Sequence, residues 1–187
     1  MTSWKDIFLV KSMLGRTTNL SCPEDVIFKC AGLAYRDMLD GGRFYLSNNK
    51  ESRCRGIIEI LEKHNYTFSR EIIDEACNLF GSEEEISGTR GRYVTRYGLA
   101  QKFVNMMFKY LYVFSDYTKK DIDFSQCDCP LDSIILGKLP EISSTWTKIT
   151  APEYTECQNE IAAKLKKKPL DMELQVLGNL AFDFLSW

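Results

Sequence analysis

One lysine and one aspartate have the type and setting to do chemistry together. Lys102 lies near the start of an apolar stretch, GLAQKFVNMMFKYL, and Asp132 opens a second one, CPLDSIILGKL, 30 residues later. A lysine amine becomes nucleophilic when burial or neighbouring cations lower its pKa, and it can then attack an electrophilic carbon to form a Schiff base. Arg96 and Lys109 supply positive charge along the same stretch. Lys102 is therefore a candidate nucleophile, and the sequence places Asp132 to meet it.

Both residues also have an ordinary structural interpretation. A lysine on an amphipathic helix commonly extends its ammonium to solvent, and spacing alone favours that interpretation for Lys102. A carboxylate in the first turn of a helix is stabilised by the helix dipole and by free backbone N–H groups, so helix capping is the default role of Asp132. Its position between Pro130 and an aliphatic run favours a more specific role.

Eight segments with helical spacing of apolar residues must position this pair. We expect helices over about residues 4–14, 23–40, 49–63, 69–80, 97–115, 130–139, 152–165 and 169–185. Residues 43–46 could be extended, but no obvious partner strand is present. The chain is therefore predicted to be all-α, as a single domain spanning 1–187 or as two small lobes that share one core.

The composition is typical of a soluble globular protein, with 44% hydrophobic and 27% charged residues. No apolar run is long enough to cross a bilayer, and the first residues lack the pattern of an export signal, so we expect a cytoplasmic protein without a membrane partner. Seven irregularly spaced cysteines indicate reduced thiols. Structural zinc needs four ligands, which the pair Cys127 and Cys129 and the only histidine, His64, do not supply. We expect neither a metal nor another cofactor.

The positive charge is concentrated in one segment. A net charge of −2 argues weakly against a nucleic-acid partner, but no acidic residue lies between Glu85 and Asp116. The basic residues of this segment are Arg90, Arg92, Arg96, Lys102 and Lys109. A solvated face is the plainer interpretation of such a run, whereas its glycines and the apolar helix that follows favour a binding surface.

The lysine in GLAQKFVNMMFKYL followed by the aspartate in CPLDSIILGKL resembles the helix-hairpin-helix DNA glycosylases, especially the branch that acts on oxidised guanine. The resemblance implies that Lys102 attacks C1′ of the damaged nucleotide. It also implies that Asp132 assists deprotonation and stabilises positive charge on the sugar. Residues 86–139 would then be the catalytic and DNA-binding segment, in which the sequence GTRGRYVTRYG stands in place of the family's hairpin. Phosphates would be held by Arg90, Arg92, Arg96 and Lys109.

A modified base must leave the DNA stack to reach the lysine, so the glycosylase hypothesis also requires a pocket for the base. We expect Gln101, Trp146 and Tyr97 to line it, although aromatic residues are more often part of a core. The competing hypothesis is a non-catalytic all-α module that binds nucleic acid or another protein through the basic segment. Lys102 and Asp132 facing each other across a solvent-reachable cleft would favour the enzyme.

Overall fold

The structure, a computed structural model, describes residues 4–39, 44–45, 49–81, 87–88, 94–139 and 144–186. Within these ranges the chain is all-α, as predicted, with ten α-helices where eight were expected. The α-helices are α1 (Trp4–Leu14), α2 (Pro23–Met38), α3 (Lys50–Lys63), α4 (Arg70–Ala76), α5 (Arg96–Val113), α6 (Ser115–Thr118), α7 (Ser133–Leu136), α8 (Ala151–Leu165), α9 (Met172–Gln175) and α10 (Leu180–Phe184). Two 3₁₀ helices accompany them, η2 (Cys77–Leu79) and η4 (Trp146–Lys148).

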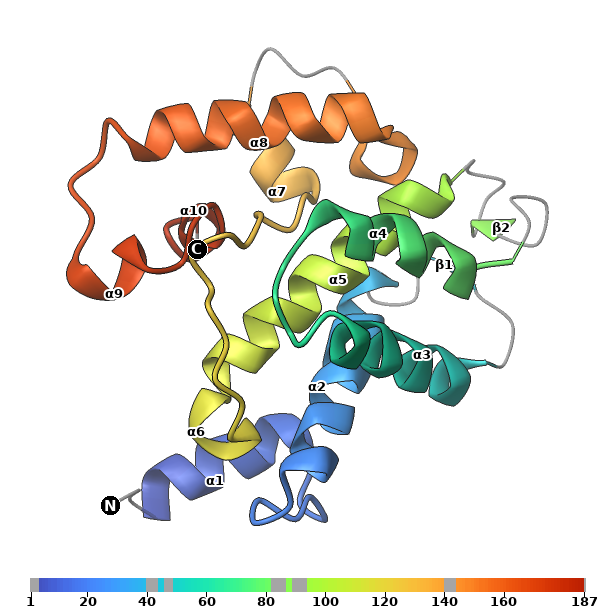
Figure 1. Cartoon of the computed structure of the whole chain (residues 1–187), viewed down its shortest axis with the longest axis vertical. Helices are drawn as coiled ribbons and strands as arrows, with labels where there is room; N and C mark the ends of the chain where they lie inside the picture. Colours follow the sequence, from blue (N-terminus) through green and yellow to red (C-terminus); the bar gives the residue numbers. More distant parts are fainter. Residues whose placement is uncertain are drawn as a thin grey trace.

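Helix α5 runs through the middle of the molecule, with α2 and α4 packed along it and α8 crossing beyond its N-terminal end (Figure 1). Every residue from Gly98 to Phe108 is buried. This corrects the interpretation in which Lys102 extends its ammonium from an amphipathic helix to solvent, because Lys102 and Asn105 are buried as well. Between Gly98 and Phe108 the side chains of this helix therefore meet protein on every face, and any chemistry at Lys102 takes place inside the fold.

The last predicted helix, 169–185, is wrong as a single element, because α9 and α10 are separate. Between them Gly178 adopts a φ of +55°, a left-handed conformation that glycine takes without a steric penalty. A Cβ at Gly178 would lie 2.4 Å from the carbonyl oxygen of Ser125. The chain after α9 therefore turns at Gly178, where the backbone passes close to the loop at Ser125. The sequence does not reveal this contact.

Two further elements were missed by sequence reasoning. Strand β1 (Phe44–Tyr45) pairs antiparallel with β2 (Ser87–Gly88), so two of the residues predicted to be extended do have a partner strand. Helix α6 begins where the predicted helix 97–115 ends and lies in the gap before the predicted helix 130–139. Both are short, and the strand pair joins residues far apart in the chain. In the part of the chain that the structure describes, no helix has the length and apolar character needed to span a bilayer.

Candidate functional site

Lys102 is buried beside an indole ring. Its side chain lies on the second turn of α5, the residue is only 5% exposed, and its Nζ lies 4.3 Å from the centre of the Trp146 ring. A cation over the face of an indole is attracted by the negative charge of the π system. The structure thus joins two predicted site residues, the nucleophile candidate and the aromatic wall candidate, which are 44 residues apart in sequence (146 − 102).

The first turn of α5 holds Trp146 in this place. The Thr95 side chain caps α5 by accepting a hydrogen bond from the Gly98 N–H, and the Thr95 N–H donates to the Thr147 carbonyl at 2.8 Å. A Cβ on Gly98 would lie 2.6 Å from the carbonyl oxygen of Trp146. Only glycine therefore lets η4 dock against the helix closely enough to bring the indole to Lys102.

Asp132 caps helix α7. It has extended backbone angles, and its Oδ1 accepts hydrogen bonds from the N–H groups of Ile134 and Ile135 at 2.9 and 3.0 Å. The residue is half-buried, and no described residue donates a hydrogen bond to Oδ2. Capping thus uses one carboxylate oxygen, which leaves the other able to accept a proton or to face a positive charge.

Gln101 connects the two halves of the site. Its Nε2 donates to the Leu131 carbonyl at 3.0 Å, and its Oε1 accepts from the Leu131 N–H at 3.1 Å. Gln101 precedes Lys102 and Leu131 precedes Asp132, so this pair of bonds joins the segment of the nucleophile candidate to that of the carboxylate. A base pocket was predicted to contain Gln101, but its second amide hydrogen goes to the Gly98 carbonyl, and the side chain is fully buried. Its donors are thus already used within the protein.

Tyr97 and Arg96, on the first turn of α5, make none of the contacts described above. Tyr97 packs edge-to-face against Tyr154 of α8, with ring centres 5.7 Å apart. Arg96 is exposed at the start of α5, where a cation opposes the helix dipole. Arg90 and Arg92 lie outside the described residues.

Lys109, predicted to bind phosphate, instead forms a buried ion pair with Asp183 of α10. Asp183 was not singled out in the sequence, since no local pattern links residues this far apart. Both charges act on the Cys129 thiol, as does Asp132. Burial holds the pKa of this thiol well above its ordinary value, the carboxylates of Asp183, Asp132 and Asp128 raise it further, and Lys109 opposes them. The Lys109–Asp183 pair therefore lies within electrostatic reach of Cys129, three residues before Asp132.

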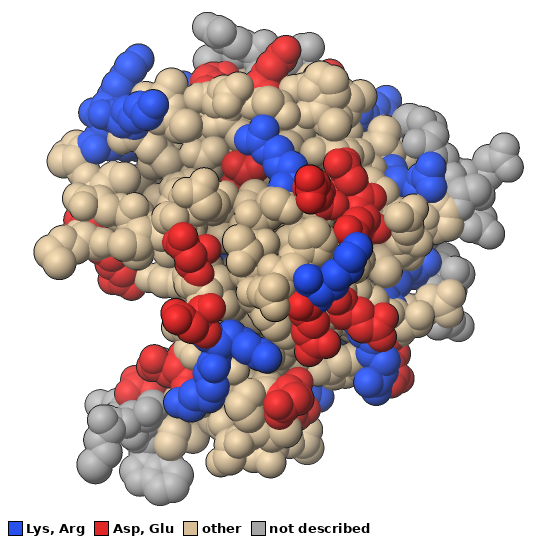
Figure 2. All heavy atoms as spheres, in the orientation of Figure 1, with Lys and Arg blue, Asp and Glu red and all other residues tan. Residues whose placement is uncertain are grey.

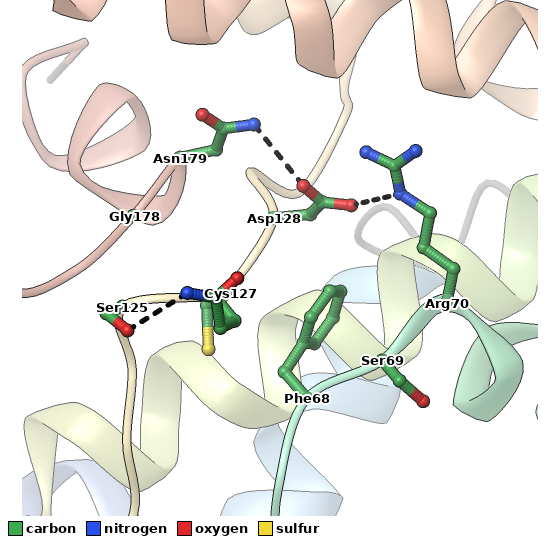
Figure 3. A pocket seen from close by; sticks show the side chains of 9 residues that line it. Phe68, Ser69, Arg70, Ser125, Cys127, Asp128, Gly178 and Asn179 are labelled. Carbon is green, nitrogen blue, oxygen red and sulfur yellow. Dashed lines mark hydrogen bonds and ion pairs between the residues drawn. The ribbon is translucent and has the colours of Figure 1, made fainter.

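A separate cavity of about 400 Å³ lies between the start of α4, the loop 125–128 and the turn before α10 (Figure 3). Its charged groups face each other, because Arg70 Nε donates to Asp128 Oδ2 at 2.9 Å. None of the predicted site residues lines this cavity, so it is not the expected base pocket. On the face shown in Figure 2 acidic and basic side chains are interspersed. Among the described residues no group of His, Cys, Asp and Glu could hold a metal ion.

Comparisons with protein families, curated proteins and solved structures gave no match.

Proposed function

We propose that this chain is a cytoplasmic DNA glycosylase that removes a damaged or modified base through Lys102 and Asp132. The observation that supports it most is the double hydrogen bond between Gln101 and Leu131. It ties the residue before the candidate nucleophile to the residue before the candidate carboxylate, two segments that only the resemblance had connected. The order of lysine and aspartate and the type of helix start at Asp132 are those that the resemblance implies.

The proposed reaction uses the neutral amine of Lys102 and the carboxylate of Asp132. The Nζ lone pair bonds to C1′ while the bond from C1′ to the base breaks, and the base leaves with the bonding electrons. Oδ2 of Asp132, which capping does not use, accepts the proton that the new C1′–nitrogen centre loses and passes it to the departing base. Opening of the sugar ring then gives a Schiff base. Trp146 would stack on the flipped nucleotide or on the lysine itself, since its ring already lies at Nζ.

The non-catalytic alternative draws on the capping role of Asp132, which explains this residue without any chemistry. Lys102, at 5% exposed, suits neither a binding surface nor the solvent-reachable cleft that was expected of the enzyme. The ion pair of Lys109 with Asp183 also removes one cation from the proposed basic surface. We therefore prefer the enzyme.

Borohydride trapping tests the proposal, because it reduces a Schiff base to a stable bond between protein and DNA. The wild-type chain is incubated with a panel of duplexes that each carry one oxidised, alkylated or deaminated base. We expect an adduct with at least one duplex and none with Lys102→Met, which keeps the length and apolar stem of the side chain. Lys166→Ala, at an exposed lysine, serves as the control and should trap like the wild type. Equal trapping by Lys102→Met would exclude Lys102 as the nucleophile.

A chain without Schiff-base chemistry could still release a base. Free base is therefore measured by chromatography in the same reactions. Absence of both adduct and released base over the whole panel would refute the glycosylase proposal.

A further inference from the structure

The segment that leads into Asp132 is held by side-chain amides at every second residue. Besides the bonds of Gln101 to Leu131, the Cys129 N–H donates to Gln158 Oε1 at 3.0 Å, and Gln158 Nε2 donates to the Cys129 carbonyl at 2.7 Å. Both glutamines are fully buried. Each amide thus replaces the neighbouring strand that an extended segment would otherwise need for its N–H and C=O groups.

A second set of bonds fixes Gln158 itself. Asn179, in the turn before α10, donates through Nδ2 to the Gln158 carbonyl at 3.0 Å and to Oε1 at 3.1 Å. Its backbone N–H donates to the Cys127 carbonyl at 2.9 Å. The same Nδ2 also lies 3.3 Å from Asp128 Oδ1, and Asp128 in turn binds Arg70 of α4 (Figure 3). The segment 127–131 is therefore held by residues of four separate parts of the fold.

We propose that Gln101 and Gln158 are positioning residues, which fix the place of the Asp132 carboxylate relative to Lys102. This inference rests on the proposed function. Water or any neighbouring backbone could satisfy the polar groups of the segment, but neither would set a distance between α5 and Asp132. Gln101 does set this distance. It lies on α5 one residue before Lys102, and it hydrogen-bonds Leu131, the residue before Asp132. Its two hydrogen bonds to one peptide unit also prevent a shift of the segment by one residue.

The kinetic test uses Gln101→Glu in single-turnover assays of base release. A neutral glutamic acid has a carbonyl that accepts and a hydroxyl that donates, so it can restore both bonds to Leu131, whereas the ionised form repels the Leu131 carbonyl. Burial disfavours the charged form of a carboxyl group, and lowering the pH converts more of it to the neutral form. We expect the rate relative to wild type to be reduced by about 10- to 100-fold near pH 8 and to recover towards pH 5, with DNA affinity changed by less than about threefold. A relative rate that does not depend on pH would refute positioning through these bonds.

Asn105→Asp is the matched control. Asn105 is equally buried on the same helix, but its amide donates to the Tyr154 hydroxyl at 2.8 Å. Among the described residues its side chain makes no hydrogen bond with Cys129 or Leu131, and it reaches the segment 127–131 only through the contact of Tyr154 with Asp128. The Asn105→Asp substitution also introduces a buried carboxyl group, with a comparable loss of stability. We expect no recovery of its relative rate at low pH, and the same recovery in both variants would attribute the effect to a general response of the core.

Hydrogen exchange tests the positioning without any activity. Near pH 8, Gln101→Glu and Gln158→Met should speed exchange of the Ile134 and Ile135 amides, which donate to Asp132, by at least about tenfold more than amides of α3. Asn105→Asp should not show this selectivity. A selective change in a chain that releases no base would refute the glycosylase proposal and retain the positioning of Asp132. Uniform exchange in an active chain would refute the positioning alone.

Discussion

Asp132 offers the sharpest separation of scaffold from catalysis, because asparagine can cap a helix but cannot take a proton. In Asp132→Asn the amide oxygen can still accept the two hydrogen bonds from Ile134 and Ile135 that Oδ1 accepts at 2.9 and 3.0 Å. Asparagine and aspartate are about equally good caps, so the stability should change by no more than about 0.5 kcal/mol. Asp132→Ala loses both bonds and should lose about 1 kcal/mol, or about 2–4 °C in melting temperature for a chain of this size.

Activity should not follow stability for these variants. If Asp132 is the catalytic carboxylate, Asp132→Asn should slow base release about 100-fold, the scale of a positioned acid–base group, while melting at nearly the wild-type temperature. Single-turnover base release and thermal unfolding are measured on the same preparations, with DNA affinity as the check that binding is intact. Wild-type rates in Asp132→Asn, together with a slower Asp132→Ala, would show that only the cap matters and would refute the catalytic assignment.

Two other predictions concern the stability of the fold. Lys109→Met leaves the buried Asp183 carboxylate without this ammonium and should cost roughly 3–5 kcal/mol, with much of the loss restored in the double variant with Asp183→Asn; an unchanged urea midpoint for Lys109→Met would contradict a structural ion pair. Burial raises the pKa of the Cys54 thiol to about 11 and that of Tyr66 to about 12. The folded chain therefore keeps protons that the unfolded chain releases, so this contribution to stability is complete below about pH 9 and is lost as the pH rises towards 12. Urea titrations at about pH 7, 9 and 10.5 should show an unfolding free energy that falls only above pH 9. A higher unfolding free energy at about pH 10.5 than at about pH 9 would contradict this direction.

Local patterns in the sequence predicted the helices well where both ends carry local signals. The predicted helices 4–14, 49–63 and 152–165 agree within a few residues with the observed α1, α3 and α8. The split between α9 and α10 was missed because its cause is the approach of Gly178 to the loop at Ser125, which no local pattern reveals. The strand pair β1–β2 was missed for the same reason.

The site shows the same division between local and distant causes. Lys102 and Asp132 were singled out from their types and settings, and the capping bonds of Asp132 follow from its position before an aliphatic helix. Spacing favoured a solvent-exposed Lys102, yet α5 is buried continuously from Gly98 to Phe108, so periodicity on one face misjudged the side of the helix that carries this lysine. The roles of Gln158 and Asn179 depend on contacts between segments more than 20 residues apart, as in the Asn179–Gln158 pair (179 − 158 = 21), and had no signal in the sequence.

The burial of Lys102 in the largely buried helix α5 has a cost in hydration. An ammonium withdrawn from water loses hydration, and the indole of Trp146 returns about 2 kcal/mol when such a contact is desolvated. Leucine or methionine at position 102 would fill the same space in this core without that loss. Sequences depart from such local preference mainly where function requires it. Gly98 and Thr95 add to the argument, because they bring η4, and with it the indole, against the helix at this lysine and not at another residue.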